Sequence, residues 1–187
     1  MLIAIIVIAV VIIVLVLILI SVNNSMIGAR NRVDESWSGI DVQLKRRHDL
    51  VPNLVETVKG YATHEREVFE KVTAARAEAT KAHTPAEAAQ KEGQLTAALT
   101  DLRAVAENYP ELRATENFQK LQNELTEIED EIQASRRIYN SNVQAYNTKI
   151  QVFPNSMIAN NRGFTAREFF EIEDAADREP VQVSFSS

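Results

Sequence analysis

The sequence predicts an all-α protein, in which an N-terminal transmembrane helix precedes an antiparallel bundle of three long helices and one short C-terminal helix. Three observations support this prediction. The first 20 of the 187 residues are apolar and uncharged, five glycines and five prolines are too few for the turns of a β fold, and apolar residues recur at spacings of four and three along much of the remaining chain. We expect an anchor over residues 1–20, a juxtamembrane connector over 21–29, the helical bundle over 30–176 and an extended tail over 177–187.

The expected anchor is a continuous aliphatic run. Twenty helical residues extend about 30 Å, which is the thickness of the hydrocarbon core of a bilayer. The run lacks the basic start and the small residues before a cleavage site that define a signal peptide, so we expect an uncleaved span that crosses the cell membrane once. Arg30 and Arg32 follow the span and no basic side chain precedes it, so the positive-inside rule favours an outside N-terminus and a cytoplasmic main domain.

The first long helix is predicted by an apolar stripe from Val33 to Ala82. Only Arg47 and Glu65 interrupt this stripe, which follows the repeat of about 3.5 residues typical of helices that pack lengthwise. Pro52 lies inside the stripe, lacks a backbone N–H and crowds the carbonyl four residues earlier, so we expect a kink or short break there.

The other helices are placed by their start and stop signals. Residues 84–87, Thr-Pro-Ala-Glu, form a capping box that opens a second helix, which Pro110 ends. Thr115 is the expected cap of a third helix that ends at Pro154. Residues 165–168, Thr-Ala-Arg-Glu, form another capping box and predict a short helix through residue 172.

The membrane-proximal part of the first stripe is the candidate interface, and its residues are Val33, Trp37, Ile40 and Leu44. The second expected helix is the shorter one and would pack against the distal part of the first. The candidate interface is then covered either by another protein or another copy of this chain, or by the third helix or the C-terminal segment folding back. The sequence leaves both alternatives open.

The densest basic cluster is formed by Lys45, Arg46 and Arg47. These residues are candidates for contact with anionic lipid headgroups or with an acidic partner. The alternative is a solvated helix face whose charge is balanced by Asp41, Asp49 and Glu56.

The composition and the histidine spacing argue against several kinds of chemistry. The absence of cysteine excludes disulfides and thiolate metal sites, and a net charge of −6 argues against nucleic-acid binding. His48 and His64 would lie about 160° apart on a straight helix, and no Glu-x-x-His pair of a bundle di-metal site is present. We therefore expect no catalytic residue, no cofactor, no metal and no small-molecule substrate.

Four segments of the chain resemble the LemA family. They are RNRVDESWS at 30–38, IDVQLKRRHDLVPNLVETVKGYATHE at 40–65, LRAVAENYPELRATENFQKLQNEL at 102–125 and RRIYNSNVQAYNTKIQVFP at 136–154. The resemblance implies a bacterial membrane protein with one N-terminal span and an antiparallel helical domain. It implies no activity, because the family has no established biochemical function.

These observations lead to a functional expectation. We expect a single-pass scaffold or adaptor that is held in the lipid bilayer by residues 1–20 and that binds other copies or a membrane-protein partner through apolar helix seams of the coiled-coil type. The alternative is a membrane-surface remodelling protein that acts through anionic lipid contact. An enzyme is not expected.

Overall fold

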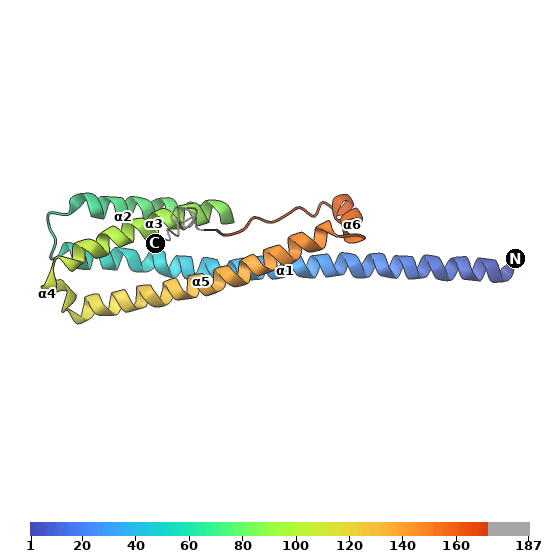
Figure 1. Ribbon diagram of the computed structural model, residues 1–187, viewed down its shortest axis with the longest axis horizontal. Helices are drawn as coiled ribbons and strands as arrows, with labels where there is room; N and C mark the ends of the chain where they lie inside the picture. The colour runs from blue at the N-terminus through green and yellow to red at the C-terminus, as the bar shows by residue number, and fades with distance from the viewer. Residues whose placement is uncertain (172–187) are drawn as a thin grey trace, which may run out of the picture. The chain divides into compact units, whose positions relative to one another are not determined.

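The structure, a computed structural model, describes residues 1–171, and all regular secondary structure within them is helical (Figure 1). The helices are α1 (Leu2–Lys59), α2 (Arg66–Ala79), α3 (Pro85–Glu107), α4 (Pro110–Arg113), α5 (Glu116–Gln151) and α6 (Asn155–Arg162). The predicted all-α class with a long apolar N-terminal helix is confirmed. The tail predicted over 177–187 lies outside the described residues.

The chain forms two compact units, and α1 and α5 each contribute to both. The first unit comprises residues 1–40 and 135–168. The second comprises residues 41–134 together with the described residues from 169 onward.

The first unit pairs the N-terminal part of α1 with the C-terminal half of α5. Side chains at spacings of three, four or seven on each helix are buried in this pairing: Met26, Ala29, Val33 and Ile40 on α1, and Tyr139, Val143, Tyr146 and Ile150 on α5. Burial of each large apolar side chain stabilises the pair by about 1.5–3 kcal/mol. The heptad-like stripes predicted from the sequence are therefore the packing faces of α1 and α5.

The N-terminal end of α1 has no cover from the described part of the chain. Every side chain in residues 1–20 is exposed, and a window of this helix has a mean hydropathy of 4.0. By length and composition α1 can cross a membrane. A continuous exposed apolar surface of this extent marks a lipid or protein contact, which is consistent with the predicted anchor.

The second unit packs the remainder of α1 with α2, α3, α4 and the first part of α5. Its core is aliphatic and includes Leu54, Val58, Leu95, Leu102, Leu112 and Ile128, each at most 2% exposed. The predicted capping box opens α3: the Glu87 N–H donates to Thr84 Oγ1 (3.2 Å), and the His83 N–H donates to the Glu87 carboxylate (3.0 Å). This start signal is confirmed.

The expected break at Pro52 is wrong, because α1 continues through it to Lys59. Proline leaves the carbonyl of His48 without its helical donor. In the structure Arg76 of α2 supplies the missing donor, with Nε donating to the His48 carbonyl oxygen at 2.6 Å. The break in the predicted stripe falls instead at residues 60–65, between α1 and α2.

The short helix predicted from residue 165 is also wrong. The short helix is α6, which ends at Gly163 in a left-handed conformation (φ 71°), and the described residues beyond Gly163 are not helical. Side chains of α5 occupy the backbone groups that a helix would need. The Thr165 and Glu168 carbonyls accept from Tyr146 and Tyr139, and the Arg167 N–H donates to Asn147 Oδ1 at 2.8 Å.

Candidate functional site

The candidate interface on α1 is covered by the chain itself. Val33 and Ile40 are 2% and 0% exposed within the first unit, and Leu44 is buried within the second. The Trp37 ring lies against the Tyr139 ring, with centroids 5.4 Å apart and an interplanar angle of 57°. Of the two alternatives that the sequence left open, the structure shows the one in which the third long helix and the C-terminal segment fold back.

The segment that follows α6 is held along this pair of helices by polar contacts. Arg167 forms an ion pair with Asp34 (2.9 Å), and the Arg30 guanidinium lies 5.6 Å from the centroid of the Phe164 ring. The Tyr139 and Tyr146 hydroxyls donate to backbone carbonyls at 2.8 and 3.0 Å. Burial raises the pKa of Tyr139 to about 12 and also raises the pKa of Tyr146, so both remain donors at neutral pH.

Arg47 lies in the interior of the second unit, where it joins three helices. It is 2% exposed, and its guanidinium donates to Glu92 on α3 (3.0 Å), to Thr96 on α3 (2.9 Å) and to Glu129 on α5 (3.2 Å). His48 contacts the other Glu92 oxygen through Nε2 at 2.6 Å. Glu92 is 1% exposed, so its carboxylate is compensated by these two neighbours.

The structure therefore separates Arg47 from the basic cluster predicted at the surface. Lys45 and Arg46 are exposed, and Arg46 donates to Gln43 at 3.1 Å. Arg47 is occupied within the chain and does not present its charge to lipid or to a partner. Its position in the apolar stripe was the only sequence signal for a buried counter-charge, and nothing in the sequence pointed to Glu92.

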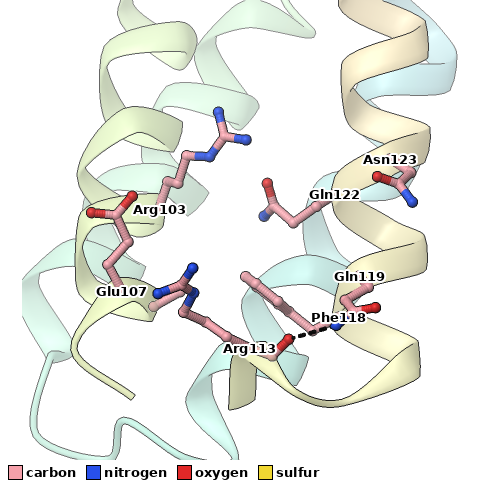
Figure 2. Close-up of a pocket in the computed structure, with 8 residues that line it drawn as sticks. Arg103, Glu107, Arg113, Phe118, Gln119, Gln122 and Asn123 are labelled. Atoms are coloured by element: carbon pink, nitrogen blue, oxygen red, sulfur yellow. Dashed lines mark hydrogen bonds between the residues drawn. The ribbon is translucent and has the colours of Figure 1, made fainter. Parts of the chain in front are cut away.

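A polar pocket opens in the second unit between α3 and α5, next to α4 (Figure 2). The cavity has a volume of about 550 Å³ and is lined by Arg103, Ala106, Glu107, Arg113, Phe118, Gln119, Gln122 and Asn123. Figure 2 shows Arg103 on α3 and Gln122 on α5 pointing toward one another across it, while Gln119 donates to the Arg113 carbonyl at 3.0 Å. No sequence pattern predicted this pocket, because its residues lie on three separate helices and meet only when these helices pack.

The chemistry of the pocket favours an anionic group. Within the described chain the guanidinium groups of Arg103 and Arg113 form no ion pair, and Glu107 is the one acid that lines the pocket. A guanidinium group presents a planar set of donors that fits a carboxylate or a phosphate. Across residues 1–171, no three or more His, Asp or Glu side chains are grouped so as to hold a metal ion.

Comparison with known proteins gives one family match and several relatives. The sequence model of the LemA family matches residues 36–185. The chain is 25% identical to magnetosome protein MamQ 2 of Paramagnetospirillum magneticum over 180 residues, which cover 82% of this chain and 66% of that protein. It is 26% identical to protein LemA of Metamycoplasma hominis over 137 residues, which cover 73% of this chain and 63% of that protein. The chain thus spans slightly less than two thirds of the length of these relatives.

Proposed function

The chain belongs to the LemA family, and from this membership and the structure we propose that it is a non-catalytic, membrane-anchored adaptor that binds a partner protein through its helical body. The continuity of α1 carries this proposal. The helix passes without a break from the exposed residues 1–20 to Met26, Ala29 and Val33, which are buried in the first unit. The span and the packed part of the first unit therefore share one continuous helix, as a membrane anchor of a folded domain requires.

We place the partner contact in the polar pocket and not on the seam around Trp37. Val33, Ile40 and Leu44 are already buried within the chain and Trp37 packs on Tyr139, so a partner would have to displace packed side chains. The pocket offers two guanidinium groups, of Arg103 and Arg113, without an ion-pair partner among the described residues. An acidic segment of a partner, which provides carboxylates, matches this charge.

Photocrosslinking in native membranes tests the adaptor proposal. A photoreactive phenylalanine analogue would replace Gln122, which lines the pocket, and in a control chain would replace Thr126, which is exposed one turn further along α5. We expect a discrete adduct from position 122 that is absent from position 126. Arg103→Glu should abolish it, whereas Lys120→Glu, an equal change of charge on an exposed residue outside the pocket, should not.

The composition of the adduct distinguishes the partners. Mass spectrometry of the adduct identifies either a different protein or a second copy of this chain, and the second result would make the protein a self-associating scaffold. An equal yield from positions 122 and 126, or an adduct that survives Arg103→Glu, would show that the pocket does not bind the partner.

A further inference from the structure

The junction between α5 and α6 exposes an apolar surface that is not packed against the described part of the chain. Val152, Phe153 and Met157 are 47%, 79% and 68% exposed. Beyond residue 20, the described chain exposes only three other large apolar side chains, and these are scattered singly over α1, the loop after it, and α5: Val42, Tyr61 and Ile138. Isolated exposed apolar residues are ordinary, whereas a group of three within six positions marks a contact surface.

Two hydrogen bonds fix the position of this junction along α1. Asn142 donates to the Arg32 carbonyl (3.4 Å), and Lys149 donates to Ser25 Oγ (2.9 Å). Seven residues forward on α5 thus correspond to seven residues backward on α1, and α5 runs toward the apolar end of α1 (Figure 1). Continued to the end of α5, the same register places Gln151 at the level of residue 23, and Phe153 follows two residues later in the turn before α6.

The end of α5 thus lies next to the boundary of the hydrocarbon core. The apolar run ends at residue 20, and the interfacial layer of a bilayer is about 5–8 Å thick on each side. Ser25 lies about 7.5 Å beyond residue 20 along a helix, so Lys149 is at the level of the headgroups. Phe153, two residues beyond the end of α5, is then close to the interfacial layer, in which amphipathic helices bury Trp, Phe and Leu side chains.

The charge of the surrounding surface matches an anionic headgroup layer. Residues 132–167 contain no Asp or Glu and five Lys or Arg residues, of which Arg167 pairs with Asp34. Lys149 and Arg162 flank the apolar junction, and Arg30 and Arg32 follow the span on α1 without an acid before Asp34. Each basic side chain near an anionic surface contributes an attraction, and together they favour acidic lipids.

We propose that the junction of α5 and α6 is a second membrane-contact site, distinct from the span. Val152, Phe153 and Met157 enter the interface of the bilayer that α1 crosses, while Lys149 and Arg162 bind its anionic headgroups. The occupant is lipid because the surface lies at the height of the bilayer boundary when residues 1–20 are inserted. A single span leaves a protein free to rotate about the bilayer normal and to tilt, whereas two contacts fix which face of the body meets the lipid.

Depth measurements on the full chain in vesicles test this proposal. The chain contains no cysteine, so Phe153→Cys, Met157→Cys and the control Ser141→Cys each give a single labelling site for an environment-sensitive fluorophore. All three side chains are exposed, so the replacements leave the core intact. The vesicles contain phosphatidylcholine with phosphatidylglycerol and carry nitroxide lipids as quenchers at the headgroup or in the upper acyl chain.

We expect the probes at 153 and 157 to emit at shorter wavelength than the probe at 141 and to be quenched by both nitroxide lipids. Lys149→Gln combined with Arg162→Gln should reduce this quenching, and so should replacement of phosphatidylglycerol by phosphatidylcholine. Emission and quenching at 153 and 157 equal to those at 141 would overturn the proposal. A shift of the emission without lipid quenching would also overturn it, because it would show that protein covers the junction. Neither result depends on the partner contact at the pocket.

Discussion

Replacement of Arg47 by methionine should strongly destabilise the second unit. Methionine keeps much of the length and apolar stem of arginine, so the main change is the loss of the guanidinium group. Glu92 would then retain only His48 as its partner while remaining 1% exposed. Leaving one member of a buried ion pair without its partner costs about 3–5 kcal/mol.

The double replacement tests the physical reason for this cost. In Arg47→Met combined with Glu92→Leu both buried charges are removed, and Glu129, whose side chain is 42% exposed, can be solvated. The double variant should therefore be more stable than Arg47→Met alone, because apolar replacement of a complete buried pair is often neutral or stabilising. The matched control is Arg46→Met, which changes an exposed neighbour and should lie within about 0.5 kcal/mol of the parent chain.

The assay is thermal unfolding of the full chain in detergent micelles, followed by far-UV circular dichroism. For a chain of this size about 1 kcal/mol corresponds to about 2–4 °C, so Arg47→Met should lower the Tm by about 6–12 °C at the low end of the expected cost. If Arg47→Met and Arg46→Met unfold at the same temperature, the buried network does not stabilise the unit. If the double variant loses as much stability as Arg47→Met and Glu92→Leu lose when each is made alone and the two losses are added, unpaired charge is not the cause.

Three further predictions follow from other contacts. Arg76→Leu should destabilise the chain by about 1–3 kcal/mol, because it leaves the His48 carbonyl without a donor. In a Pro52→Ala background the backbone N–H of residue 52 can donate instead, so the loss measured by denaturant unfolding should shrink. Equal losses in both backgrounds would contradict this account of the uninterrupted helix. The pKa of Tyr139 is raised from about 10 to about 12, so its contribution to the free energy of unfolding should be complete below pH 10 and lost as the pH rises toward 12. In unfolding curves measured over a pH series, Tyr139→Phe should remove this part of the alkaline loss of stability. An alkaline loss that Tyr139→Phe leaves unchanged would refute the prediction. A single cysteine in place of the exposed His64 should react with an impermeant reagent only after cells are permeabilised, and labelling of intact cells would overturn the cytoplasmic placement of the body.

Local signals in the sequence predicted those parts of the fold that local physics decides. The apolar stripe of α5 and the cap at Thr84 depend on residues within a few positions of one another, and both are confirmed. The break at Pro52 was wrong because the rescuing donor, Arg76, lies 24 positions further along the chain on another helix. The helix predicted from Thr165 was wrong because tyrosines of α5 take its backbone groups, which no local pattern reveals.

The candidate sites show the same limit. The sequence named the seam residues correctly as an apolar face but left open what covers it, since coverage depends on how far α5 extends along α1. Arg47 was grouped with its exposed neighbours because position alone does not disclose a buried partner on α3. The pocket residues Arg103 and Gln122 meet only when α3 and α5 are packed, so their proximity was not visible before the fold was known.

The unbroken course of α1 between lipid and body constrains how the chain can vary there. A helix advances by about 100° per residue, so one residue inserted between Ile20 and Met26 would turn the part of the first unit that follows the insertion about the axis of the span and raise it by about 1.5 Å. The surface at Phe153 would then face a different direction relative to the lipid-embedded side chains. Only insertions close to whole helical turns would restore the direction in which this surface faces, and even these would lift it away from the headgroups. The helical segment between residues 20 and 26 therefore sets both the height and the rotational orientation of the packed helices relative to the bilayer, so its length matters as much as its composition.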